Sequence, residues 1–182
     1  MNLVETALDI AMDAHRGQTR KNSNMPYIIH PMRVADAIAL DGMLTTVALL
    51  HDVLEDCPRE RLVEFQSRIN ELGEWVGEEV SLLTRGDHDD KVVYMQSFMQ
   101  KPIRSLIVKV FDRYDNVMDF MRHDKTYARI YARKAKPVYD AFYDRKKEFI
   151  TFGGEDFWFR MYLMVDEMVG ICVTPSPEPI HD

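Results

Sequence analysis

Apolar residues recur every three or four positions along most of the chain, a spacing typical of amphipathic helices. The first such segment begins near Leu3 and should end near Arg16, because Gly17 follows it and glycine often ends a helix. Further helices are expected over residues 31–40, 44–57, 59–85 (two helices hinged at Gly73), 91–100, 102–121, 124–149 (bent at Pro137) and 155–170. No segment has the alternation of a convincing strand. The pattern therefore predicts an all-α fold.

Length and composition predict one globular domain. The chain has 182 residues, of which 46% are hydrophobic, and only 8 glycines and 8 prolines interrupt the helical pattern. No internal repeat or linker divides it. We expect a single domain over residues 1–172, followed by a flexible C-terminal tail over residues 173–182, where three prolines accompany no apolar cluster.

Charge and cysteine content exclude several classes of protein. The net charge of −7 argues against a general nucleic-acid binder. No run approaches the roughly 18 apolar residues that span a membrane, and Glu5 and Asp9 lie where a signal peptide would be apolar. Cys57 and Cys172 match no metal-binding spacing and are expected to be reduced thiols. These features predict a cytoplasmic protein with no membrane or nucleic-acid partner.

Four ionisable residues stand among apolar neighbours and suggest a metal site. His51 and Asp52 follow one another inside the apolar run 48–54, and His30 and Asp112 have similar surroundings. Burying such groups without partners is costly, and a divalent cation would satisfy them together. Nitrogen and oxygen ligands without thiolate favour Mn²⁺, Fe²⁺, Mg²⁺ or Zn²⁺, and two histidines with two carboxylates suit a six-coordinate ion such as Mn²⁺.

Simpler roles remain open for the same residues. The His51–Asp52 pair could make local hydrogen bonds at a helix end, and His30 could be a core histidine. Asp112 could form an ion pair with Lys109 or Arg113, which lie three residues before it and one after it. The sequence pattern alone does not choose between these roles and a metal site.

Further polar residues lie one helical turn from the predicted ligands. Residues four apart share a helix face, and three pairs have this spacing: His51 with Glu55, Asp52 with Asp56, and Asp112 with Asn116. Glu55 and Asp56 could therefore orient or deprotonate a water molecule beside the cation. A basic stripe could attract a polyphosphate, although such a stripe is more often a solvated face; it comprises Lys125, Arg129, Arg133 and Lys136.

Four sequence blocks carry a resemblance to a known family. They cover residues 14–21, 26–35, 48–56 and 108–116, and read AHRGQTRK, PYIIHPMRVA, ALLHDVLED and VKVFDRYDN. In this order and spacing they resemble the HD-domain hydrolase module of the RelA/SpoT superfamily, in its small stand-alone form, the small alarmone hydrolases. The resemblance covers roughly residues 7–140. It implies a helical bundle that uses Mn²⁺ to remove the 3′-pyrophosphate of guanosine tetra- or pentaphosphate.

The resemblance also implies roles for individual residues and leaves a homo-oligomer open. The implied metal ligands are His30, His51, Asp52 and Asp112, and the implied catalytic acidic pair is Glu55 and Asp56. Arg20 matches the arginine that packs on the guanine of the nucleotide, Lys21 is its neighbour, and Asn116 matches a nucleoside contact.

Three departures from the family pattern concern base specificity. The loop between Lys21 and Pro26 is one residue longer than usual, Asp115 replaces a histidine, and Asp119 replaces a threonine beside the nucleoside. An ionised Asp119 could accept hydrogen bonds from the N1–H and amine of guanine. Two alternatives stay open: an HD phosphohydrolase acting on another nucleotide or NADPH, and a nucleotide-sensing module without turnover. The intact Glu55–Asp56 pair argues against the sensing module, since a degenerate site would tolerate its loss.

Overall fold

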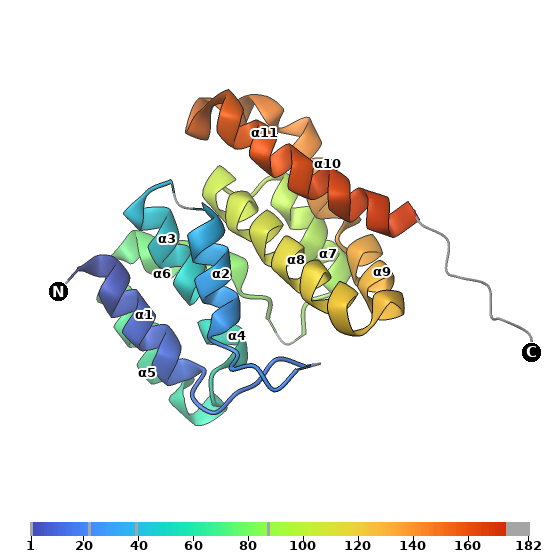
Figure 1. The fold of residues 1–182 in the computed structure, drawn as a ribbon. Helices are drawn as coiled ribbons and strands as arrows, with labels where there is room; N and C mark the ends of the chain where they lie inside the picture. Colours follow the sequence, from blue (N-terminus) through green and yellow to red (C-terminus); the bar gives the residue numbers. More distant parts are fainter. Residues whose placement is uncertain (1, 22, 39, 87, 174–182) are drawn as a thin grey trace, which may run out of the picture.

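The described part of the chain is built from helices (Figure 1). The computed structural model describes residues 2–21, 23–38, 40–86 and 88–173. Among these residues the only strand-like feature is an isolated antiparallel bridge between Thr19 and Pro26. The all-α prediction is therefore confirmed. No described helix is long and apolar enough to cross a membrane.

The N-terminal half packs short helices around α3, in which residue 44 and residues 46–50 are buried. Helices α1 and α2 both contact α3, and α6 covers it from another side. The bounds are α1 Leu3–Ala14, α2 Ile29–Ile38, α3 Gly42–Leu50, α4 Val53–Asp56, η1 Arg59–Arg61, α5 Leu62–Asn70 and α6 Glu74–Leu83. Gly73, with φ at 137°, separates α5 from α6 and confirms the predicted hinge.

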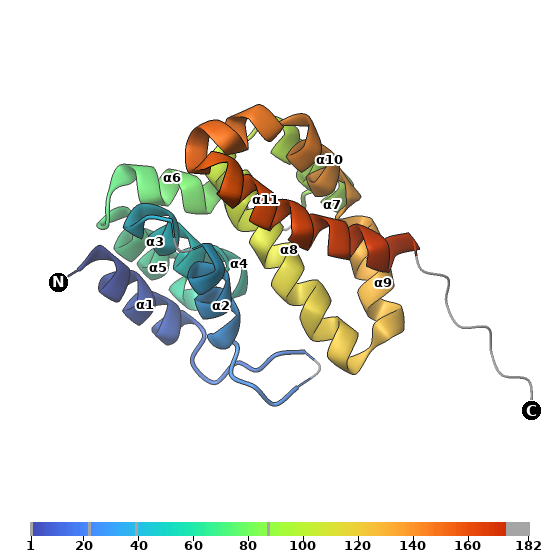
Figure 2. The same ribbon diagram turned by 45° about the horizontal axis from the view of Figure 1, so that its top comes forward.

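The C-terminal half is organised by α8, which contacts α2 on one side and α9, α10 and α11 on others. Figure 2 shows α11 lying across α8 and α9. The bounds are α7 Lys91–Gln96, η2 Ser97–Met99, α8 Ile103–His123, α9 Lys125–Lys134, α10 Lys136–Asp144 and α11 Lys146–Val173. The Asp124 side chain accepts a hydrogen bond from the Tyr127 N–H and so caps α9, as the sequence predicts.

Several predicted boundaries were wrong. The helix expected over 124–149 is interrupted at Ala135 and Arg145, and Pro137 lies in the first turn of α10, where proline is tolerated. The start of the last helix at 155 was predicted correctly, because α11 (Lys146–Val173) consists of two helical segments that meet at Gly154. Gly154 breaks the helical geometry within α11, with φ at 86°.

Two further boundaries affect the site and the tail. Helix α2 begins at Ile29, two residues before Pro31, and α3 ends at Leu50, just before the His51–Asp52 pair that it was expected to carry. The predicted tail begins at Val173, which ends α11, and residues 174–182 lie outside the described residues.

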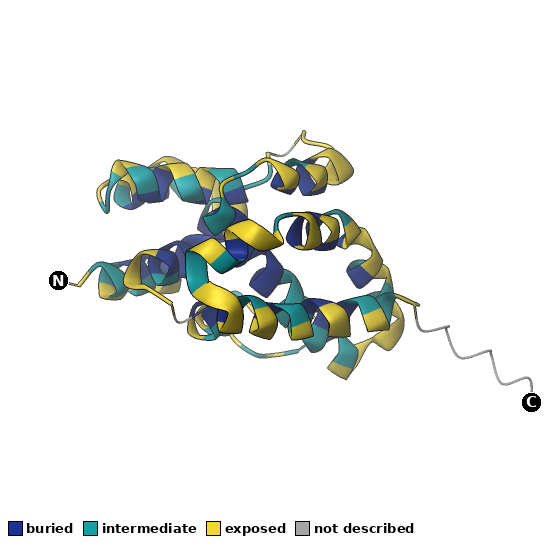
Figure 3. Ribbon diagram, turned by 90° about the horizontal axis from the view of Figure 1, so that it is seen from above, coloured by how far each residue is buried: buried dark blue, intermediate teal, exposed yellow. Residues whose placement is uncertain are grey.

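Burial follows the inner faces of the helices (Figure 3). Most buried residues are apolar, yet several ionisable side chains are buried as well. They are His15, Arg20, His30, His51, Asp52, Lys109, Asp112 and Asp119. Because burying unpaired charge is costly, such a group indicates a site with a specific role.

Candidate metal centre and active site

The four predicted metal ligands lie together although they come from three elements. His30 lies in the first turn of α2, His51 and Asp52 form the turn between α3 and α4, and Asp112 lies on α8. Ligand atoms of His30, His51 and Asp112 all lie within 4.8 Å of one another. Asp52 Oδ2 lies 3.4 Å from His30 Nε2 and 3.2 Å from His51 Nε2. These side chains could therefore hold one cation between them.

Both imidazoles present an Nε2 lone pair to this cluster. His51 Nδ1 lies 2.7 Å from the Ala48 carbonyl oxygen, and His30 Nδ1 lies 2.7 Å from Asp115 Oδ2. A carbonyl or carboxylate oxygen only accepts hydrogen bonds, so Nδ1 carries the proton in both rings. Among the described residues, neither buried Nε2 has a hydrogen-bond partner. Two buried Nε2 atoms without a hydrogen-bond partner suit a metal ion, which would take the place of any proton bound there.

Asp112 divides its two oxygens between the cluster and a lysine. Its Oδ1 lies 3.4 Å from His30 Nε2, and its Oδ2 lies 2.8 Å from Lys109 Nζ. The carboxylate therefore makes the ion pair considered above and still offers one oxygen to a cation. Burial would raise the pKa of Asp112, but Lys109 and Arg113 outweigh it and hold that pKa well below its usual range.

The cluster strongly favours positive charge. Burial alone would lower the pKa of His30, but the carboxylates of Asp112, Asp115 and Asp52 outweigh it and raise that pKa to about 10. The Tyr27 hydroxyl donates a 2.8 Å hydrogen bond to Asp52 Oδ2 and fixes that carboxylate as well. A divalent cation would supply the same positive charge, and the nitrogen and oxygen donors suit Mn²⁺, Fe²⁺, Mg²⁺ or Zn²⁺.

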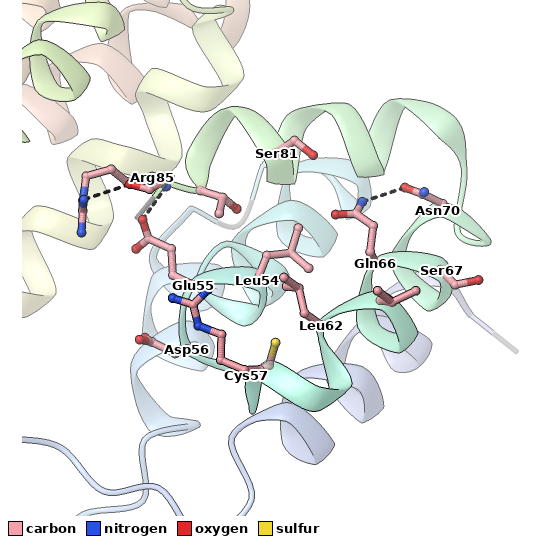
Figure 4. Close-up of a pocket in the computed structure, with 14 residues that line it drawn as sticks. Leu54, Glu55, Asp56, Cys57, Leu62, Gln66, Ser67, Asn70, Ser81 and Arg85 are labelled. Carbon is pink, nitrogen blue, oxygen red and sulfur yellow. Dashed lines mark hydrogen bonds between the residues drawn. The ribbon is translucent and has the colours of Figure 1, made fainter. Parts of the chain in front are cut away.

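Glu55 and Asp56 lie on α4, directly beyond the ligand turn. Glu55 accepts a hydrogen bond from the backbone N–H of Arg85, and Figure 4 shows its side chain directed toward Arg85. Both carboxyl groups are exposed at a cavity surface. Desolvation by the surrounding protein raises the pKa of each, and for Asp56 the charge of Asp52 adds to the effect. Raised carboxyl pKa values suit groups that take up and release protons.

Two cavities meet at Glu55. One, of about 790 Å³, lies between α5 and α6 and has a mixed lining of apolar residues, uncharged polar residues such as Gln66 and Ser81, and charged residues of both signs (Figure 4). The other, of about 590 Å³, is lined by Glu55 together with Lys109 and a set of further cations. These cations are Lys21, Arg85, Lys91, Arg113, Arg133 and Lys134. The second cavity, which we call the basic cavity, offers positive charge beside the ligand cluster in a chain of net charge −7.

The basic stripe expected from the sequence contributes little to this cavity. Of its members only Arg133 lines the wall, and Lys136 is paired with Asp140 at 2.7 Å on the same helix. The cavity draws its cations from separate elements instead, which periodicity along one helix could not reveal.

The predicted substrate-binding residues differ in their surroundings. Lys21 lines the basic cavity. Arg20 is buried and its Nη2 lies 3.2 Å from Asp119 Oδ2, while Asn116 donates a 2.5 Å hydrogen bond to Asp112 Oδ1. Arg20, Asn116 and Asp119 therefore all have protein partners in this structure.

Sequence reasoning missed several residues of the site. Tyr27 and Arg85 carried no pattern of their own, and Lys109 was considered only as an alternative partner of Asp112. Asp115 was noted as a departure from the family but received no role. His15 is buried near the site as well, and its Nδ1 lies 2.8 Å from Gln18 Oε1.

Comparisons with known proteins agree with this geometry. The HD domain family model matches residues 7–147. A guanosine-3′,5′-bis(diphosphate) 3′-pyrophosphohydrolase of Vibrio cholerae is 35% identical over 180 residues, covering 88% of this chain and 25% of that protein. The bifunctional (p)ppGpp synthase/hydrolase SpoT of Escherichia coli is 33% identical over 181 residues, with the same coverage of 88% and 25%. The chain thus spans about a quarter of the length of these relatives.

A solved structure shows the same fold over nearly the whole chain. It is described as "A metazoan ortholog of SpoT hydrolyzes ppGpp and plays a role in starvation responses", and it aligns with a TM-score of 0.73 at 22% identity. The alignment covers 93% of this chain and 95% of that one. Together with the family match and the buried histidine and aspartate cluster, these findings show that the chain belongs to the HD domain family and that its HD domain is of the RelA/SpoT type.

Proposed function

We propose that this protein is a Mn²⁺-dependent phosphohydrolase that removes the 3′-pyrophosphate of guanosine 3′,5′-bis(diphosphate), releasing GDP and pyrophosphate, or that of the corresponding pentaphosphate, releasing GTP and pyrophosphate. The observation that carries the proposal is the basic cavity beside the cluster of His30, His51, Asp52 and Asp112. A polyanionic substrate is the ligand that such a cavity attracts, and relatives at 33–35% identity are described as acting on this nucleotide.

Each part of the site has a role in this reaction. The four ligand residues would hold the ion, which when bound supplies Lewis acidity toward a phosphoryl oxygen and the attacking water. Glu55 takes the proton from that water, and Asp56 beside it holds the water in place. Lys109 and Arg113 face the basic cavity and offset the negative charge of the phosphates. Water adds to the phosphorus, the bond from phosphorus to the 3′-oxygen breaks, and that oxygen is protonated.

Base recognition involves residues that are paired with each other before substrate arrives. We propose that Arg20 packs on the guanine and that Asp119 accepts hydrogen bonds from it, with Lys21 and Asn116 contacting the nucleotide. Because Arg20 and Asp119 are 3.2 Å apart, both would have to exchange this contact for the base. A site built on such hydrogen bonds rejects an analogue that lacks the donors.

The test is hydrolysis of a nucleotide panel by the purified protein loaded with Mn²⁺. Guanosine 3′,5′-bis(diphosphate), its adenosine analogue, NADPH and GTP are incubated separately, and the products are resolved by anion-exchange chromatography. We expect GDP and pyrophosphate from the first compound at the highest kcat/KM, and no turnover after Asp52→Ala. Asp119→Thr should narrow the difference between the guanosine and adenosine compounds.

Three outcomes would overturn the proposal. Faster hydrolysis of another nucleotide or of NADPH would assign a different substrate to the same site. Binding of the guanosine compound without any product would assign a sensing role. Equal base selectivity in the wild type and Asp119→Thr would remove Asp119 from base recognition.

A further inference from the structure

Carboxylate groups of a single helix, α8, approach both ring nitrogens of His30. Asp112 Oδ1 lies 3.4 Å from Nε2, and Asp115 Oδ2 lies 2.7 Å from Nδ1. The two aspartates are three residues apart on α8 and therefore share a face of that helix. The His30 side chain is 0% exposed, so the ring could not turn without losing both contacts. Its orientation is thus set from α8 although it belongs to α2.

We propose that Asp115 is a positioning residue for His30. Its carboxylate accepts the Nδ1–H, which fixes the tautomer whose Nε2 lone pair faces the ligand cluster. It also makes the imidazole a stronger donor to a divalent cation, as carboxylate partners of ligating histidines do. This inference rests on the metal site of the proposed function and adds to it a residue that does not touch the ion.

The two histidines of the cluster are supported differently. His51 donates its Nδ1–H to the neutral carbonyl of Ala48, three residues before it in the chain. His30 donates to a charged group that is 85 residues away, and charge-assisted hydrogen bonds are about twice as strong as neutral ones. His30 is therefore expected to depend on its partner more than His51 does.

Asp115 is itself held in place by two guanidinium groups. Arg20 Nη2 lies 3.5 Å from its Oδ2, and Arg33 Nη1 lies 3.7 Å from its Oδ1. A purely structural role for Asp115 would consist of these ion pairs alone. Asp119 provides the comparison, because it lies one turn further along α8, pairs with the same Arg20 at 3.2 Å, and makes neither a hydrogen bond nor an ion pair with His30.

The experiment titrates the metal-free full chain with Mn²⁺ by calorimetry. Asp115→Ala should weaken Mn²⁺ affinity by about 10- to 100-fold, the usual cost of losing such a partner. Asp115→Asn should weaken it less, because the amide oxygen can still accept the Nδ1–H. The matched control Asp119→Asn should bind Mn²⁺ like the wild type, since it loses an ion pair to Arg20 but no contact with a ligand.

A second measurement separates positioning from a folding defect. Excess Mn²⁺ should restore most of the kcat of Asp115→Ala, because added metal compensates for weak binding and does not repair a disrupted fold. Wild-type Mn²⁺ affinity in Asp115→Ala, or equal losses in Asp115→Asn and Asp119→Asn, would overturn the inference. If the wild type itself binds no Mn²⁺, the metal site of the proposed function fails instead.

Discussion

The turn between α3 and α4 and the helix α8 both contribute predicted metal ligands, but they present these side chains through different local geometry. The turn places His51 and Asp52 beside each other where regular helix stops, whereas α8 places Asp112, Asp115 and Asn116 on regular helix at spacings of three and four. Each contributes to the ligand cluster and to the polar groups around it. The difference is that the turn is held by uncharged hydrogen-bond partners, the Ala48 carbonyl and the Tyr27 hydroxyl, whereas the carboxylates of α8 are paired with cations such as Lys109.

The local bonds of the turn are visible in the structure. His51 donates to the carbonyl of Ala48, and the backbone N–H of Asp56 donates to the carbonyl of Asp52 at 3.0 Å. On α8, in contrast, Asp112 is paired with the buried Lys109 and faces His30 from another helix. A change on α8 should therefore disturb folding and chemistry together, and a change in the turn should disturb chemistry alone.

The largest effect is expected for Asp112→Asn, which removes a proposed cation ligand and leaves Lys109 buried without its counterion. We expect turnover to be lost and the free energy of unfolding to fall by about 3–5 kcal/mol, as for other broken buried ion pairs. Asp52→Asn should also lose turnover but cost less stability, since Tyr27 can donate to the amide oxygen. Urea denaturation of the metal-free proteins measures the free energy of unfolding of both variants, and the nucleotide assay measures their turnover.

The double variant Lys109→Met with Asp112→Asn is the control. It removes the unpaired ammonium and should regain much of the stability but none of the turnover. Equal unfolding free energies for Asp52→Asn and Asp112→Asn would contradict the contrast between the turn and α8.

Next in size is Glu55→Gln, which tests the acidic pair beyond the turn. The amide oxygen can still accept the N–H of Arg85, so the fold and the Mn²⁺ affinity should persist. The kcat should fall by about 10²- to 10⁴-fold, the usual contribution of a general base. Stopped assays of product formation measure it, with the exposed Glu60→Gln as a control. Undiminished kcat in Glu55→Gln would exclude the role.

The pH dependence of turnover also tests whether Glu55 is the general base. Burial disfavours the ionised form of Glu55 and raises its pKa above the ordinary 4.5, and only the ionised form can take a proton. At saturating Mn²⁺, kcat should therefore fall about tenfold per pH unit below that raised pKa and level off above it. The acid limb should disappear in Glu55→Gln, and an unchanged limb would assign it to another group.

The smallest effect is expected for Gly154→Ala, at the irregularity in α11. Its φ of 86° and ψ of 173° lie in a region that is nearly exclusive to glycine. The substitution should lower the free energy of unfolding by about 1–3 kcal/mol and leave kcat unchanged, because this break carries no polar site. Thermal unfolding and the standard assay test it. Reduced kcat in a fully folded variant would show that α11 influences the site.

The sequence was informative wherever the evidence was local. Helical periodicity, the Asp124 cap and the Gly73 hinge all follow from residues within a few positions of one another. The four predicted ligands were singled out because His30 and the others stand in apolar runs, where a buried ionisable group needs a partner, and the structure brings them together. The boundaries within 124–149 were misjudged, because a proline in the first turn of a helix cannot be told in sequence from a proline that bends a helix.

The sequence by itself determined the helical class and the identity of the groups that could hold a cation. The tertiary structure decided what those groups face: His30 and Asp115 are 85 positions apart, and Arg20 and Asp119 are 99 apart. It also decided that Glu55 meets Arg85 and that cations from several elements line one cavity. The physical reason is that the periodicity of apolar residues fixes which side of a helix is buried. Contacts across the core depend instead on the angles at which the helices cross and on where along each helix they touch.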